Sequence, residues 1–376
     1  MVLISVSAFG GYTIYKNYYD QRQQLINAIN QITLTLNFTV THNGKSYSTI
    51  IPNDLLTDNF YKLMLSLFTP CYSSSTQIVY TVVLTSNVPD NVVMWNCNSS
   101  TSIFGFASTF NAINGGVIEI GTSSITPKTS DYNLNTAFQT YFTTTSSCNI
   151  GTTDNIVTSG SESISSSASI TETGLLLDIG SIYILLSHDT FSAIVVNSGD
   201  TVTVSYTLNL NNVGFNNNLC QILYGILQYE VGNAVLQITL TDITGTSYIY
   251  CIKNPMMSSV SILTAINGAS CTSSSWSGGS NYNFIQMAIG TAANTFTPSS
   301  YALTSQIAST VITNNVYSST NAQVYYTTTF TLPNTKTIAE AGLFLQINTI
   351  TFLMFAINPT ATVFTANTPT GITLYI

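Results

Sequence analysis

Two glutamates occupy matching positions in the chain. Their residue type and spacing make them the first candidates for a catalytic or metal-binding site. Glu172 and Glu340 each lie two residues before a glycine in an apolar run. A carboxylate fixed twice at a strand start more often accepts backbone hydrogen bonds or caps a turn than performs catalysis. We therefore predict a structural role for both glutamates. A calcium ligand is the alternative, because calcium prefers carboxylate oxygens.

A histidine beside an aspartate forms a second candidate, since His188-Asp189 resembles half of a catalytic dyad. The matching place in the second glutamate block is Ala356-Ile357. The chain also lacks G-x-S-x-G, H-E-x-x-H and a phosphate-binding glycine loop with lysine. We therefore interpret His188-Asp189 as a polar pair at a strand end, and we expect no enzymatic activity and no cofactor.

The glutamates belong to an internal repeat, which sets the elements that position them. Residues 120–134 and 289–303 both open with Ile-Gly-Thr, continue with Thr-Pro and end with Tyr-x-Leu. The first glycine precedes the second by 53 positions in one copy and by 52 in the other. We expect the repeated glycines to serve backbone geometry or close packing. The repeat positions are Gly121, Tyr132, Glu172 and Gly174, then Gly290, Tyr301, Glu340 and Gly342.

The composition is unusual in its lack of charge. Of 376 residues, 45% are hydrophobic and only 6% are charged, against about a quarter in ordinary domains. Seven basic and fifteen acidic residues give a net charge of −8, with no basic cluster. Nucleic-acid binding depends on neutralising phosphates with basic side chains, so a nucleic-acid partner is disfavoured. Such a surface, wetted by Ser, Thr, Asn and Tyr, is typical of extracellular or virion-surface proteins.

Cysteines and glycosylation signals agree with an extracellular setting. Six cysteines allow fifteen pairings, and free buried thiols are the alternative to disulfides. The pairs that we favour are Cys71 with Cys97 and Cys251 with Cys271. Two acceptor tripeptides for N-glycosylation begin at Asn37 and Asn98. Without a Cys-x-x-Cys motif, and with two histidines, the chain predicts no metal site.

The N-terminal segment 1–31 is predicted to form a helix used for anchoring or assembly. Residues 1–15 carry no charge, and later apolar residues recur at helical spacing. Fifteen residues are short of the roughly 20 that a spanning helix needs. The segment could touch a membrane through residues 1–15, join a bundle of identical helices or insert into a base protein. Packing on the first domain is the simpler alternative.

Alternating apolar residues predict an all-β fold. Clean alternation runs through 32–40, 202–210 and 324–332, whereas short helical patterns occur at 54–67 and 216–227. The serine-rich stretch 158–169 is interpreted as a loop. We expect two tandem antiparallel β-sandwich domains, jelly-roll-like, at 32–211 and 212–376, after the N-terminal helix.

The repeated block, followed by I-x-E-x-G-L and a final G-D-T-V-T-V-x-Y strand, resembles a module in structural proteins of tailed phages and archaeal viruses. The residues concerned are 120–134, 170–177 and 199–206, with a second copy at 289–303 and 338–345. Low charge and tandem domains further resemble turret proteins of Sulfolobus turreted icosahedral virus. The resemblance implies a thermophile-associated, non-enzymatic vertex spike on the virion surface. Its partners would be further copies of the chain, other capsid proteins, and a host receptor or glycan.

Two other classes of function remain open at this point. One is a pilus or thread subunit on an archaeal cell surface, in which an N-terminal strand or helix inserts into the next subunit. The other is a glycan-binding adhesin, whose sign would be a groove lined by Trp95 or Trp276.

Overall fold

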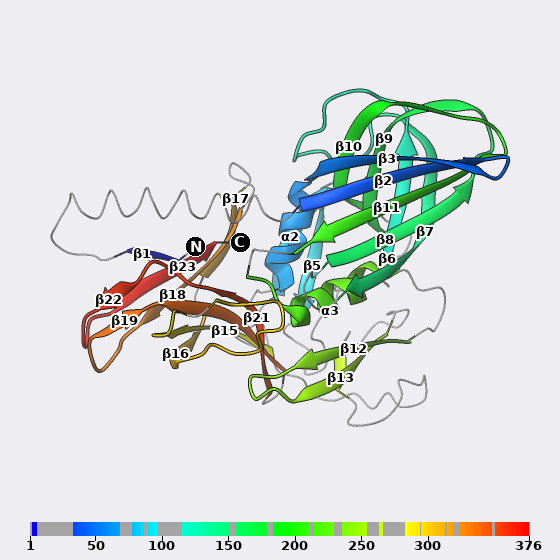
Figure 1. Ribbon diagram of the computed structural model, residues 1–376. Coiled ribbons are helices and arrows are strands. Elements are labelled where there is room, and N and C mark those ends of the chain that lie inside the picture. Colours follow the sequence, from blue (N-terminus) through cyan, green and yellow to red (C-terminus); the bar gives the residue numbers. More distant parts are fainter. Residues whose placement is uncertain are drawn as a thin grey trace.

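The computed structural model describes most of the chain (Figure 1). The described residues are 2–5, 33–67, 77–83, 85, 89–96, 115–149, 155–178, 183–210, 214–228, 235–253, 263–265, 283–293, 295–312, 314–318, 323–347 and 350–375. Antiparallel strands dominate these ranges, and the predicted all-β class is confirmed.

The first half curls into a closed barrel of eight antiparallel strands, in the order β10-β3-β2-β11-β8-β7-β6-β9. Alternation places Leu34, Leu36 and Phe38 inside and exposes Asn37, as the sequence predicts. The bounds are β2 Thr33–His42, β3 Lys45–Leu56, β6 Gly115–Gly121, β7 Ala137–Asn149, β8 Asn155–Ser163, β9 Ala168–Asp178, β10 Tyr183–Val196 and β11 Thr201–Asn209.

The second half contains two four-stranded antiparallel sheets, β1-β23-β18-β17 and β16-β15-β20-β21, with a small β19-β22 pair. Val324, Tyr326 and Ile372 lie in its core. The bounds are β1 Val2–Ser5, β15 Asn283–Gly290, β16 Gln306–Val311, β17 Asn314–Ser318, β18 Gln323–Phe330, β19 Lys336–Ile338, β20 Glu340–Ile347, β21 Ile350–Ile357, β22 Thr362–Phe364 and β23 Thr370–Tyr375.

The strand orders of the two halves correspond. The series β2-β11-β8-β7 in the barrel matches β1-β23-β18-β17, and β7-β6-β9-β10 matches β16-β15-β20-β21. The long strand β7 belongs to both series. In the second half, two separate strands, β16 and β17, take the positions that β7 takes in the first. Strand β1, at the start of the chain, therefore takes the place in the second half that β2 takes in the first.

Two helices lie between the halves (Figure 1). Helix α2, Asp58–Leu67, packs on β10 of the first half and on β17 and β18 of the second. Helix α3, Asn217–Leu227, packs on β21 and on β7 and β8. Asn216 caps α3 by accepting the Leu219 N–H at 3.3 Å. Because each helix touches both halves, the apolar interior is continuous across them.

Each helix is followed by a small accessory sheet. The antiparallel pair β4 and β5 comes after α2, and the three-stranded sheet β12-β13-β14 comes after α3. The bounds are β4 Gln77–Val83, β5 Pro89–Asn96, β12 Val235–Thr241, β13 Ser247–Lys253 and β14 Leu263–Ala265.

Three predictions about local structure are corrected. Residues 2–5 form strand β1 instead of the start of a helix, because they pair with β23; the rest of the predicted helix, 6–31, lies outside the described residues. The stretch 158–169 is not one loop but the end of β8, a short turn and the start of β9, since buried Thr158 and Ile164 anchor it. Helix α2 starts at Asp58, because residues up to Leu56 extend β3.

Candidate functional site

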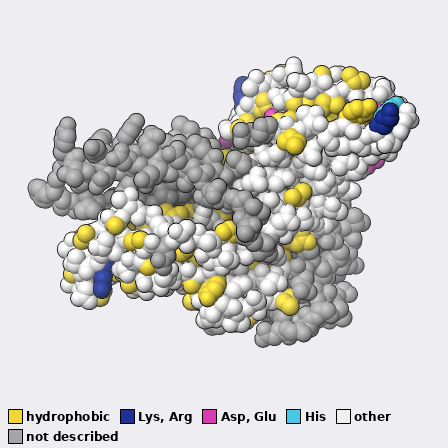
Figure 2. Space-filling view, viewed as in Figure 1, with side chains coloured by type: hydrophobic (Ala, Val, Ile, Leu, Met, Phe, Trp, Pro, Cys, Tyr) yellow, Lys and Arg dark blue, Asp and Glu magenta, His cyan; other side chains and the backbone are white. Residues whose placement is uncertain are grey.

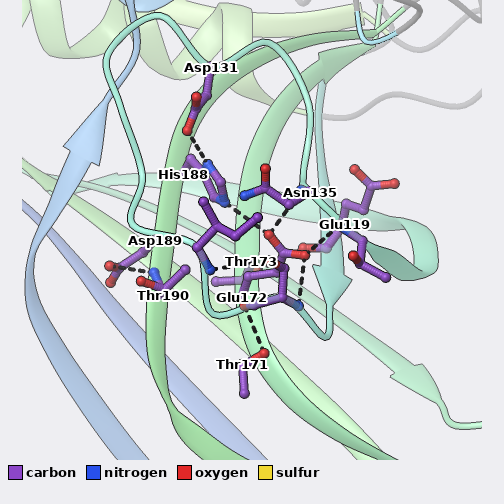
Figure 3. Close-up of polar contacts among 12 residues, drawn as sticks. Glu119, Asp131, Asn135, Thr171, Glu172, Thr173, His188, Asp189 and Thr190 are labelled. Atoms are coloured by element: carbon purple, nitrogen blue, oxygen red, sulfur yellow. Dashed lines mark hydrogen bonds and ion pairs between the residues drawn. The ribbon is translucent and has the colours of Figure 1, made fainter.

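A buried polar cluster lies on the outer face of β6, β9 and β10 in the first half, beneath the loop 122–136 (Figure 3). At its centre is Glu172, whose side chain is fully buried. Glu172 Oε1 accepts the backbone N–H groups of Ser123 at 3.1 Å and Thr136 at 2.7 Å, and Oε2 accepts that of Asn135 at 3.0 Å. One carboxylate thus fastens both ends of the loop to the sheet, which confirms the predicted backbone-binding role.

His188 completes the cluster from β10. Its Nε2 lies 3.1 Å from Glu172 Oε2, and its Nδ1 lies 2.8 Å from Asp131 Oδ2. The imidazole is fully buried, whereas the Asp131 side chain, on the loop, keeps 22% of its surface exposed. Both ring nitrogens are therefore engaged by carboxylates, and both must donate when these carboxylates are ionised. The arrangement favours an imidazolium ion held between two anions.

The surroundings of His188 and Glu172 shift the pKa values of these two groups in opposite directions. Burial lowers the pKa of His188, but hydrogen bonds and charge from Glu172 and Asp131 outweigh it and leave the pKa above its ordinary value. Burial likewise raises the pKa of Glu172, but the hydrogen bonds from His188 and three backbone N–H groups leave it below its ordinary value. The cluster therefore stabilises the charged forms of both groups.

Two further carboxyls belong to strands that carry this cluster. Glu119, on β6, is buried opposite Gly174 of β9. Burial, followed by the charge of Glu172, raises the pKa of Glu119 to about 7 against the opposing effect of His188. Asp189 points away from the cluster (Figure 3), and burial raises its pKa as well. Its Oδ1 accepts the Thr190 N–H at 2.8 Å, while its buried Oδ2 has no hydrogen-bond partner among the described residues.

The partners of His188 differ from those that the sequence suggested. Asp189 is its neighbour in the chain but not its hydrogen-bond partner, and the pair lies within β10 and not at a strand end. This correction follows from strand geometry, because successive residues point to opposite faces of a sheet. In the Asp131–His188–Glu172 series both ring nitrogens are engaged by carboxylates. The series can hold a buried charge and fix the loop.

A glutamate also binds the backbone of the corresponding loop in the second half, but without a histidine. We call this arrangement of carboxylate and loop backbone the carboxylate clamp. Glu340 is fully buried, and its Oε2 and Oε1 accept the N–H groups of Thr304 at 2.9 Å and Ser305 at 2.6 Å. The repeat register places Ala288 where the first half has Glu119 and Ala356 where it has His188. Both alanines are buried in an apolar cluster with Leu303, Phe344 and Leu353.

The repeated glycines make room for these contacts. A Cβ at Gly121 would lie 2.5 Å from Glu172 Oε1 and from the Thr136 carbonyl oxygen, and Gly290 meets Glu340 in the same way. A Cβ at Gly174 would lie 2.7 Å from Leu185 Cδ1, and its counterpart at Gly342 would lie 2.9 Å from Leu353 Cδ1. Close packing is therefore the reason for these four glycines, as the sequence predicts.

The other predicted residues lie away from this cluster. Tyr132 is half-buried and Tyr301 is exposed, so neither belongs to the core. Asn37 is exposed on β2, whereas Asn98 lies outside the described residues. The predicted pairs Cys71–Cys97 and Cys251–Cys271 also involve residues or side chains outside the described part, as do Trp95 and Trp276.

A disulfide that the sequence did not indicate joins Cys148 of β7 to Cys220 of α3. It connects the two halves across 72 positions of sequence. The pairs that the sequence favoured, Cys71–Cys97 and Cys251–Cys271, each lie within one copy of the repeat. The only signal for the observed pair was the amphipathic pattern of α3, which places Cys220 among its buried residues.

Glu119 and Asp131 were also missed. Glu119 is a lone charge within the apolar run Val-Ile-Glu-Ile, and this mismatch was a usable signal. Asp131 lies in the repeated block but has serine, Ser300, at the matching place. Its role depends on how the loop crosses the sheet.

Within the described ranges, no group of three or more His, Cys, Asp or Glu is arranged to hold a metal ion. A search of the same ranges finds no helix that is long and apolar enough to span a membrane. No family model, curated protein or solved structure matches the chain.

Proposed function

We propose that the protein is a non-enzymatic structural subunit of an extracellular assembly, namely a turret or spike at a virion vertex. In this proposal the halves are two tandem jelly-roll-like sandwiches that act through their surfaces. Their partners are further copies of the chain, other capsid or vertex proteins, and a host receptor or glycan.

The main support for the proposal is that the polar atoms of His188 and Glu172 are already hydrogen-bonded within the protein. Both His188 nitrogens and both Glu172 oxygens are used in internal hydrogen bonds. A general base needs a position within hydrogen-bond reach of a substrate proton, and the fully buried imidazole offers none. The repeated use of the glutamate in a half that has no histidine also favours a role in folding.

Two further features support an extracellular assembly. Most of the described surface visible in Figure 2 belongs to neither charged nor hydrophobic side chains, as the 6% charged composition implies. The Cys148–Cys220 disulfide fits an oxidising compartment, where such bonds persist. Together they support a location on a virion surface, or on an archaeal cell surface in the second candidate function.

The second candidate is a pilus or thread subunit, and the pairing of β1 with β23 favours it. Strand β1 comes from the far end of the chain and pairs along the edge of β23. An extended segment of one subunit completes the sheet of a neighbouring subunit in the same way. Closed rings and open filaments differ only in whether the rotation between subunits closes.

Electron microscopy with mass determination separates these functions. The purified full-length chain is compared with a version that lacks residues 1–31. A turret predicts closed rings of one definite number that fall to monomers on truncation. Open filaments would replace the turret by the pilus, and a monomer in both samples would contradict both assembly functions.

A further inference from the structure

The C-terminal strand β23 accepts a strand from the opposite end of the chain. Val2, Leu3, Ile4 and Ser5 of β1 oppose Leu374, Thr373, Ile372 and Gly371 in antiparallel register. Ile372 and Leu374 are fully buried. The other edge of β23 is occupied by β18.

The corresponding strand of the first half is attached quite differently. Strand β2 pairs with β11 over nine residues and continues through the Asn43-Gly44 turn into β3. Among the described residues, no strand lies between β11 and α3 to take this place, because α3 follows β11 after only a few residues. Without β1, the backbone groups of β23 on that side would form an open edge, which is a template for pairing with another chain.

We propose that this place beside β23 receives residues 2–5 of a second copy of the chain when copies assemble. The proposal rests on the function proposed above and names how its subunits are joined. Exchange of an identical strand preserves every hydrogen bond of the β1–β23 pair, so it costs little. One chain offers its β1 and accepts another at β23, so the contact is head-to-tail and propagates into a ring or a filament.

Concentration decides between pairing within one chain and pairing between chains. The segment 6–32 contains 27 residues. A chain of that length spans at most about 90 Å, at about 3.3 Å per residue. Exchange between copies therefore competes with pairing within one chain where neighbouring copies are packed closely together, as in an assembled particle.

Engineered cysteines test the exchange directly. Leu3 and Thr373 are opposed residues, and opposed Cα atoms at about 4.5–5.5 Å fall within disulfide range. Co-expression of a Leu3→Cys chain with a Thr373→Cys chain allows a 3–373 disulfide only between two copies. We expect that link in a dimer-sized band, found by mass spectrometry of non-reduced peptides, and we expect its yield to rise with protein concentration.

The control is Thr327→Cys with Thr373→Cys, a pair opposed inside the β18–β23 ladder, which should link within one chain. The double variant Leu3→Cys/Thr373→Cys establishes that β1 reaches β23. The proposal is overturned if that double variant links only within one chain and the co-expressed chains do not link, or if neither links.

Light scattering on the same samples separates strand exchange from the assembly function proposed above. Oligomers without a 3–373 link would retain the assembly function and reject strand exchange, whereas monomers would count against both.

Discussion

The two halves of the molecule use one glutamate in two surroundings. Glu172 and Glu340 occupy the same repeat position, are fully buried and bind the backbone of the loop that crosses the sheet. Around Glu172 lie a histidine and a second buried carboxyl, His188 and Glu119, whereas around Glu340 the matching residues are alanines. The carboxylate clamp is therefore the common element of the fold, and the ionic cluster is an addition to it.

This difference shows what the clamp needs and what it does not. The second half holds its loop with two backbone hydrogen bonds to Glu340 and with apolar packing of Ala288 and Ala356. A charged histidine is thus not required for the clamp. In the first half the imidazolium compensates the buried charge of Glu172, and removal of one member leaves an uncompensated charge.

The largest difference is expected from removing the charge of each glutamate. Glu172→Gln leaves the His188 cation with Asp131 alone and should cost about 3–5 kcal/mol, the usual loss for breaking a buried ion pair. Glu340→Gln weakens backbone hydrogen bonds only and should cost about 1–3 kcal/mol. Denaturant unfolding followed by circular dichroism measures both. Equal losses would show that the ionic partners add nothing.

The disulfide between the halves should come next. Cys148→Ala with Cys220→Ala opens a link across 72 positions, for which chain entropy gives about 4 kcal/mol. The midpoint of thermal unfolding should fall, and the two halves should unfold less cooperatively in calorimetry. The same double substitution compared under reducing conditions is the control, because there it should change little. An unchanged midpoint in oxidising buffer would refute the prediction.

The effect of pH should distinguish the halves through Glu119. Its folded-state pKa of about 7 exceeds the ordinary 4.5, so the fold prefers the protonated form. Stability is therefore lost as pH rises from about 4.5 to about 7, by up to about 3 kcal/mol. Glu119→Gln should stabilise the protein at pH 8 and change little at pH 4. Equal effects at both values would contradict the raised pKa.

The smallest effects should be the same in both halves. Gly121→Ala and Gly290→Ala push a Cβ against the clamping carboxylate, and each should cost about 1–3 kcal/mol. Gly160→Ala in β8 is the control, since its nearest heavy atoms lie 3.1 Å away and a small shift accommodates it. A loss at Gly121 no greater than the loss at Gly160 would mean that the carboxylate does not depend on this space.

Local patterns predicted much of this structure. Alternation identified β2, β11 and β18, and the helix positions held to within a few residues at their starts. The backbone-binding glutamates and the packing glycines also followed from their repetition. These features are encoded within short stretches of chain, where period and residue type carry the information.

Contacts between distant segments could not be predicted in this way. Asp131 and His188 are 57 positions apart, and they meet only because the loop 122–136 crosses β10. The Cys148–Cys220 bond and the β1–β23 pair likewise depend on how the two halves pack together. An alternating or helical pattern identifies an element but not its neighbour.

The protonation state of His188 tests the central claim. That claim is that the buried charged cluster of the first half stabilises the fold and is not a reactive site. His42→Ala leaves His188 as the only histidine, so its nitrogen resonances are unambiguous in an NMR titration. We predict that both ring nitrogens are protonated at pH 7 and that their protons exchange slowly with solvent. A neutral imidazole at that pH, with one free nitrogen and rapid exchange, would contradict the account.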